Sequence, residues 1–188
     1  MLTQLSTIIS LIKALSYGII RNKEPNTVLS NCVKCSSSTL KESDLCNEAI
    51  FPAYGAAGIS GYTNTPLSNE DSILITKDGS GVGSLRYVRG SHSFVGTLNS
   101  LTPKEGIYLP YMYYVLQNLN LDIFKTGQAI PHIYFKDYGK EAIFCPSYSI
   151  QKKLAGGLEL MESKKDNETV ILQNLYKMKA YFLISLFI

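Results

Sequence analysis

Apolar residues recur at intervals of three and four near both ends of this 188-residue chain. At the N-terminus this spacing predicts an amphipathic helix over residues 2–21 whose apolar face docks on protein. A secretion signal or a membrane anchor is the rival interpretation. No basic residue precedes the apolar run, however, and Lys13 interrupts it, which favours the docked helix. The face is formed by Leu5, Ile8, Ile12, Leu15 and Ile19.

The C-terminal segment after Pro146 is predicted to form one long helix over residues 147–188. Two apolar stripes run along it, separated by the charged stretch 162–168. A long helix with a narrow apolar stripe is typical of coiled coils and helix bundles. Gly156 and Gly157 weaken its first turns by about 1 kcal/mol each relative to alanine. We expect subunit contacts through Leu154, Leu158, Met161, Leu172, Leu175 and Phe182.

Between these helices the pattern changes to short blocks rich in β-branched residues. Ser72–Lys77 and Ser84–Arg89 are the clearest predicted strands, because turn-forming residues bound them. Leu109–Leu119 has helical spacing, and Pro110 is tolerated in its first turn. Further strands are predicted at Thr27–Cys35, Glu48–Tyr54, Ile130–Phe135 and Glu141–Phe144.

These elements divide the chain into an N-terminal helix over residues 1–22, an α/β domain over 23–146 and a helix over 147–188. We expect the domain to hold a twisted mixed sheet flanked by helices. Because 45% of the residues are hydrophobic and 18% are charged, the chain is globular rather than disordered. The net charge of +3 is mildly basic and does not by itself identify a polyanionic partner.

The four cysteines include one C-x-x-C pair, Cys32 and Cys35. A structural zinc site needs a second pair or two closely spaced histidines. Here Cys46 stands alone, and His92 and His132 are far apart in the sequence. We therefore expect no metal site and instead free thiols in a reducing cytoplasm, where the protein is predicted to reside.

The glycine-rich segment Gly79–Gly83 raises the alternative of an enzyme that binds a phosphorylated ligand there. The sequence that follows is strand-like and lacks a Gly-Lys-Ser/Thr motif, so a turn between two strands explains it better. Neither histidine has a recognisable triad context, and His132, in an apolar block, is expected to be structural. We predict no catalytic residue and no bound cofactor.

Three segments in order share one family pattern. Pro52–Tyr62 carries a Tyr-Gly…Gly-Ile-x-Gly-Tyr stretch, Ile73–Gly83 a strand followed by a Gly-Ser…Gly turn, and Gly127–Gln151 an apolar block that ends at a proline before a helix. Together they resemble the specificity subunit of type I restriction-modification systems, over about residues 27–188. Each motif alone is weak, but their order followed by a long helix is more specific.

The resemblance implies a non-catalytic subunit that reads double-stranded DNA and positions two enzymes. These are a modification (methyltransferase) subunit, which uses S-adenosylmethionine, and a restriction subunit, which uses ATP. A full specificity subunit has two target recognition domains held apart by two antiparallel helices. This chain shows one such domain and one spacer helix, so it resembles half a subunit. We expect a homodimer through residues 147–188, or reliance on a sister subunit if the chain is truncated.

Placed by chemistry and loop position, the predicted DNA contacts lie in the loops around residues 34–41, 60–64 and 77–92. Lysine and arginine neutralise phosphates, and arginine also reads guanine through two hydrogen bonds. Ordinary solvated strand positions are the alternative for the two arginines. The predicted contacts are Lys34, Lys41, Tyr62, Lys77, Arg86, Arg89 and His92.

Overall fold

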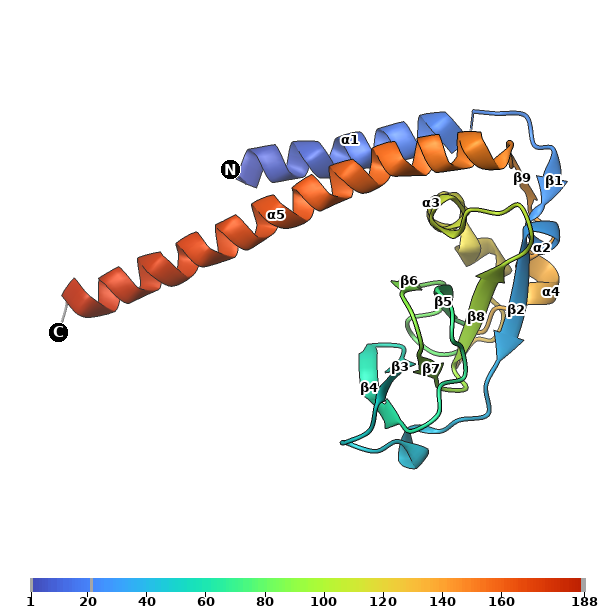
Figure 1. Ribbon diagram of the computed structural model, residues 1–188, viewed down its shortest axis with the longest axis horizontal. Helices are drawn as coiled ribbons and strands as arrows, with labels where there is room; N and C mark the ends of the chain where they lie inside the picture. Colours follow the sequence, from blue (N-terminus) through green and yellow to red (C-terminus); the bar gives the residue numbers. More distant parts are fainter. Residues whose placement is uncertain (1, 21, 187–188) are drawn as a thin grey trace.

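The computed structural model describes residues 2–20 and 22–186. Helices α1 (Leu2–Ile20) and α5 (Tyr148–Leu186) lie side by side and run in opposite directions (Figure 1). A mixed α/β domain is attached at one end of the pair, and α5 extends past the start of α1 at the other end (Figure 1). Both predicted terminal helices are therefore confirmed over the described residues, with residues 21, 187 and 188 of those predictions lying outside them. The α/β fold class with its long C-terminal helix is confirmed as well.

The larger sheet has four strands, all antiparallel to their neighbours. All five residues of its interior strand β5 are buried, as expected of a strand that contains isoleucine, leucine and threonine side chains in succession. The predicted hairpin from β5 to β6 is confirmed, and its turn uses positive φ angles at Gly79 and Gly83. In sheet order the strands are β2 (Val33–Ser37), β8 (Leu98–Pro103), β5 (Ser72–Thr76) and β6 (Leu85–Val88).

A second sheet lies at the end of the domain farthest from the helix pair (Figure 1). Strands β3 (Phe51–Gly55) and β4 (Gly58–Thr63) form a hairpin with a bulge at Ala53/Tyr54. Strand β7 (Ser93–Phe94) pairs with β3 in parallel, which makes this sheet mixed. The glycine-rich stretch 55–61 therefore lies largely in the two strands of this hairpin.

Strands β1 (Thr27–Val28) and β9 (Ala142–Ile143) pair antiparallel where the chain enters and leaves the domain. Helix α3 (Leu109–Gln117), with a proline in its first turn as predicted, packs against both α5 and strand β6. Its buried tyrosines keep their hydroxyls satisfied: Tyr111 donates to the Phe144 carbonyl at 2.9 Å and Tyr114 donates to Glu162 at 3.1 Å. The main core therefore lies between the larger sheet and the helices.

Several short elements differ from the sequence expectation. The strand predicted over Ile130–Phe135 is wrong: only isolated bridges form at His132, and the end of the block begins helix α4 (Phe135–Tyr138). The strand predicted over Thr27–Cys35 is interrupted by helix α2 (Leu29–Cys32). Strand β8 was not expected at all. The remaining short helices are η1 (Glu42–Asp44) and η2 (Leu121–Phe124).

Helix α1 docks on the protein, as expected, but not through all of its predicted face. Ile12 and Ile20 are buried, and Ser16 is buried beside them, where it accepts a hydrogen bond from the Asn118 amide. Leu15 remains exposed. Among the described residues, no helix combines the length and apolar character needed to cross a membrane.

Helix α5 is joined to the domain through a buried glutamine near its start. Gln151 is 1% exposed, and its Oε1 accepts a hydrogen bond from the Tyr108 backbone N–H at 2.8 Å. Its Nε2 donates to the carbonyls of Pro146 at 2.8 Å and Gly106 at 3.2 Å. One side chain thus links the turn before α3, the turn before α5 and α5 itself, which fixes the direction in which α5 leaves the domain.

Candidate nucleic-acid interface

The predicted DNA-contact residues do not gather into one patch. Lys34 lies on β2 and Arg86 on β6, and these are the two opposite edges of the four-stranded sheet. Both side chains are exposed. Exposed basic side chains can contact DNA phosphates. Because Lys34 and Arg86 lie on opposite edges of the sheet, however, one straight duplex would have to approach them from different sides.

Arg86 connects the β6 edge to the second sheet. Its guanidinium carbon lies 5.9 Å from the centre of the Tyr54 ring on β3, within the range of a cation–π contact. A Cβ atom placed at Gly58, where β4 begins, would lie 3.8 Å from an Arg86 guanidinium nitrogen. The exposed cation is therefore held beside the β3–β4 hairpin, where small residues leave the backbone accessible.

Lys41 and Tyr62 belong to this same outer part of the domain. Tyr62, on β4, exchanges two backbone hydrogen bonds with Cys46, at 3.0 and 2.8 Å. Lys41 precedes η1, where its backbone N–H donates to Asp44 at 2.9 Å and its side chain is exposed. These backbone hydrogen bonds hold the segment that carries Lys41 against β4. We refer to Lys41, Tyr62 and Arg86 together as the outer basic–aromatic face.

Lys77 lies apart from that face. It follows β5 and is half-buried, with backbone hydrogen bonds to Thr97 and Ile133, each 2.9 Å long. Burial raises the pKa of the Cys35 thiol to about 11, and the positive charge of Lys77 opposes that rise.

The placement of His92 among the DNA contacts needs correction. His92 is fully buried, so it does not reach a nucleic acid. Its Nδ1 donates to the Gly90 carbonyl at 2.8 Å, and its Nε2 accepts from the Ser72 hydroxyl at 2.8 Å. Both ring nitrogens are satisfied within the protein, which is the usual state of a core histidine. The sequence did not indicate that His92 is buried, because the residue stands alone near basic residues.

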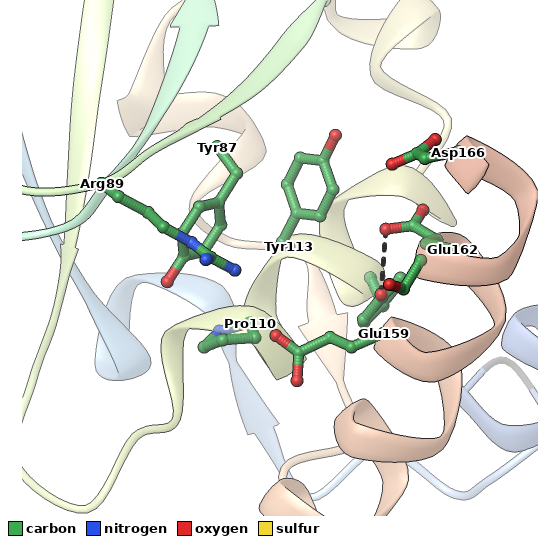
Figure 2. Close-up of a pocket in the computed structure, with 9 residues that line it drawn as sticks. Tyr87, Arg89, Pro110, Tyr113, Glu159, Glu162 and Asp166 are labelled. Atoms are coloured by element: carbon green, nitrogen blue, oxygen red, sulfur yellow. Dashed lines mark hydrogen bonds between the residues drawn. The ribbon is translucent and has the colours of Figure 1, made fainter. Parts of the chain in front are cut away.

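Arg89 faces an acidic cleft between the domain and α5. Figure 2 shows Arg89 and Tyr87 on one side of the cleft and the carboxylates of α5 on the other. The cleft has a volume of about 390 Å³, and the Arg89 guanidinium lies 6.0 Å from the centre of the Tyr87 ring. Phosphates would meet more negative than positive charge here. The acidic residues that line it are Glu159, Glu162 and Asp166.

The tyrosines of this cleft are held in their neutral form. Burial raises the pKa of Tyr87, and the neighbouring Asp71, which accepts its hydroxyl hydrogen bond at 3.0 Å, adds to the rise. Burial likewise raises the pKa of Tyr114, followed by the effect of Glu162. These phenols act as hydrogen-bond donors to carboxylates and have no feature of an activated nucleophile.

One polar pair near the β5–β6 turn was not foreseen as a unit. The Nδ1 of His132 donates to Asp78 at 2.7 Å, and both side chains are about one third exposed. His132 also exchanges two backbone hydrogen bonds with Thr126, while Gly79 donates to the Pro131 carbonyl. Two loops distant in sequence are thereby fastened together. In the sequence, His132 and Asp78 each stand beside a turn, and no motif links the two residues.

The Gly79–Gly83 turn leads into strand β6, so the dipole of a following helix is not available to a phosphate there.

Cys32 and Cys35 lie in different environments, the first packed near Cys145 and the second near Lys77. No group of three or more metal-ligating side chains occurs in the part of the chain that the structure describes.

The predicted interface residues of α5 fall into two groups. Leu158 is 2% exposed and belongs to the chain's own core, with Leu154 packed against the same core, so their assignment to a subunit interface is corrected. Met161 is half-buried. Farther along, Leu172 is half-buried, whereas Leu175 and Phe182 are exposed by 47% and 53%.

The same arrangement occurs in known proteins. A family model described as the type I restriction modification DNA specificity domain matches residues 31–177. The chain belongs to this family. A Mycoplasma genitalium protein assigned as a type I specificity subunit is 30% identical over 162 residues, covering 81% of this chain. The EcoprrI specificity subunit of Escherichia coli is 21% identical over 122 residues, covering 65% of this chain.

The chain spans less than half the length of these curated relatives, with matches that cover 41% and 30% of them. Among solved structures, the S subunit of the M. genitalium type I system superposes with a TM-score of 0.72 at 22% identity, covering 94% of this chain and 54% of that one. The HsdS subunit of Thermoanaerobacter tengcongensis gives 0.67 at 15% identity, covering 88% and 46%. These likenesses establish the shared fold.

Proposed function

We propose that this chain reads a DNA sequence within a type I restriction-modification system and performs no chemistry itself. The observation that carries the proposal is the family match over residues 31–177, together with a fold shared with specificity subunits over nearly the whole chain. In this proposal residues 23–146 are the target recognition domain, residues 1–22 are the N-terminal helix, and residues 147–188 are the spacer helix.

We assign the primary DNA contacts to the outer basic–aromatic face of Lys41, Tyr62 and Arg86. All three lie at or beside the β3–β4 hairpin, which is the part of the domain farthest from the helix pair (Figure 1). Lys34 and Lys77 supply additional positive charge elsewhere on the domain. Arg89 is the least favoured of the original set, because it lines a cleft with three carboxylates.

The modification and restriction subunits are the proposed protein partners. A solved structure that concerns complex assembly and conformational transition of a type I system has a TM-score of 0.73 with this chain, at 14% identity, and covers 92% of it and 48% of that chain. DNA phosphates do not favour the acidic cleft beside α5, and the distal part of α5 exposes mainly apolar side chains. Both are therefore available to protein partners in a specificity subunit, and S-adenosylmethionine and ATP would be bound by those partners.

We further propose a homodimer through the distal part of α5. Beyond Thr169 the helix exposes large apolar side chains on all sides, which a soluble protein covers with a partner. Helix α1 covers only the proximal part (Figure 1). A sister specificity subunit is the alternative occupant. The exposed apolar residues are Val170, Ile171, Leu175, Tyr176, Met178, Tyr181, Phe182, Leu183 and Ile184.

The deciding experiment is selection from random duplex oligonucleotides, with the chain alone and with a modification subunit of a type I system. A defined enriched sequence in either arm supports the proposal, and enrichment of none in both arms contradicts it. Arg86→Ala should weaken binding and lower the salt slope by about one if Arg86 contacts a phosphate. Lys152→Ala is the matched control, because Lys152 is exposed on α5, away from the outer face.

A further inference from the structure

A large groove lies beside the helix pair, where α1, α5 and the end of α3 meet. It has a volume of about 1140 Å³, and most of its lining surface is apolar. Among its lining residues on α1, Ile12 and Ser16 are buried, whereas Ile9 and Tyr17 are 38% and 53% exposed. The groove is therefore an open apolar surface that no segment of the described chain fills.

The distal part of α5 is a second uncovered apolar surface, and we call its residues 170–184 the tail. A helix that is apolar on all sides is normally buried, yet the large side chains of the tail are exposed. At 1.5 Å of rise per residue the tail is about 22 Å long, and α1, with 19 residues, is about 28 Å long. A helix of the length of the tail can thus lie along α1 without extending past it.

The charges on the two surfaces are compatible. The tail contains no acidic residue, and its charged residues are Lys177 and Lys179. Two lysines and two carboxylates line the groove, so charge does not oppose the approach of the tail. One of these carboxylates, Glu162, accepts a hydrogen bond from the neutral Tyr114 hydroxyl and keeps its full negative charge for a lysine of the tail. Burial of apolar surface would then drive the contact.

We propose that the groove receives the tail of a second copy of this chain, an inference that rests on the homodimer proposed above. On the α5 side the groove is lined by residues 162–169, which directly precede the tail on the same helix. Only an antiparallel arrangement of the two α5 helices therefore brings each tail to the groove of the other copy. A two-fold axis then forms two identical contacts, each between one tail and one groove.

This arrangement makes α1 part of the interface between the copies. Specific dimers bury roughly 1,600 Å² in total, so each of the two contacts has to supply about 800 Å². The tail alone would offer only one apolar surface for this purpose, whereas the groove adds the exposed side chains of Ile9 and Tyr17. Substitutions in α1 should consequently affect dimerisation, which a contact between the two tails alone does not predict.

The first test is sedimentation of the full chain with substitutions in the groove. Ile9→Asp combined with Tyr17→Asp should weaken dimerisation at least about tenfold, because a carboxylate would replace apolar contact surface. Leu11→Asp with Leu15→Asp is the matched control and should remain a dimer. Leu11 and Leu15 are 48% and 43% exposed on the same helix but do not line the groove. Circular dichroism should show equal helical content in the two variants.

A mixing experiment distinguishes a tail in a groove from a tail on a tail. The tail variant Leu175→Asp with Met178→Asp should be monomeric by itself. An equimolar mixture of the tail variant and the groove variant should form a heterodimer, because the first supplies an intact groove and the second an intact tail. One of the two original contacts is restored in this way, so the heterodimer should be weaker than the original dimer. A mixture that stays monomeric would overturn the proposal.

Hydrogen exchange of the unmodified chain provides a measurement that needs no substitution. Raising the concentration through the range of dimerisation should protect residues 9–17 as well as the tail. Protection of the tail alone, or a groove variant that remains dimeric, would overturn the groove as the receiving site and leave the homodimer standing. A monomer at every concentration would overturn both. Selection of DNA sequences is a separate measurement, so the recognition function is tested independently of this contact.

Discussion

The distal half of helix α5 is richer in apolar residues than the proximal half, yet it is the less buried of the two. Up to Thr169 the helix packs on α1 and α3, and its residues Gln151, Ala155 and Leu158 are at most 2% exposed. From Val170 onward the described side chains are exposed or half-buried, although many are large and apolar. One continuous helix thus begins as part of a domain core and ends as a surface that its own chain does not cover.

The difference shows that a periodic apolar stripe predicts burial but does not identify the partner. Both stripes in α5 predicted subunit contacts, yet the first is covered by the same chain. The proximal half should therefore determine folding stability, and the distal half should determine assembly. Substitutions in the two halves separate these roles.

The largest expected effect is that of Leu158→Ala. Leu158 is 2% exposed within the main core, and removing a buried leucine side chain costs about 3 kcal/mol of unfolding free energy. Urea denaturation would measure it. Leu160→Ala is the matched control, because Leu160, two positions along the same helix, is 74% exposed and should change stability by less than about 0.5 kcal/mol. Equal losses in the two variants would contradict the assignment of Leu158 to the core.

Gln151→Ala should come next. It would leave the Tyr108 N–H and the carbonyls of Gly106 and Pro146 without their present partner, at a cost of about 2 kcal/mol. Hydrogen exchange should also accelerate at the start of α5, since the junction is held by this side chain. A variant as stable as the unmodified chain, with unchanged exchange, would show that the junction is held by other contacts.

An effect of similar size and opposite sign is expected from Gly156→Ala combined with Gly157→Ala. Both glycines lie in α5, and an added Cβ atom at either position would have nothing within 4 Å. Alanine should therefore stabilise the helix by about 1 kcal/mol at each site through its higher helix propensity. Thermal unfolding would show a raised midpoint. A lowered midpoint would mean that these glycines serve a bend or a contact in the folded protein.

The smallest change in folding stability is expected in the distal half. Leu175→Ala with Met178→Ala removes two side chains that are 47% and 53% exposed, so unfolding in dilute solution should shift by less than about 0.5 kcal/mol. Assembly should respond instead: sedimentation at micromolar concentration should show a dimer for the original chain and a monomer for the variant. A monomer in both cases would remove the proposed homodimer.

The sequence predicted the fold well wherever one local signal was strong. Ile73–Thr76 is a run of β-branched and leucine residues, and with Ser72 it forms a fully buried interior strand. Leu98–Pro103 was missed because polar residues break its pattern. These residues are buried by tertiary contacts: Asn99 exchanges hydrogen bonds with Ser37 and Tyr138, while no partner for the Ser100 hydroxyl is found among the described residues.

The candidate site was less predictable, because sequence gives residue type but not exposure or direction. His92 and Arg86 are close in sequence, yet one is fully buried between strands and the other is exposed at a sheet edge. Arg89 follows the same strand but lies at an acidic cleft. The carboxylates of that cleft come from α5, which is distant from Arg89 in the sequence. Contacts between segments distant in sequence determine the surroundings of each of these residues, and no local sequence pattern indicates those contacts.

The two outer strands of the larger sheet, β2 and β6, each carry one solvated cation, Lys34 and Arg86. Unsatisfied backbone groups at such margins can recruit a foreign strand, and a charged side chain there discourages that recruitment. The same two residues therefore oppose strand addition at these edges, whether or not nucleic acid is present. Replacing both would invite self-association by strand addition, so light scattering should accompany every titration of those variants.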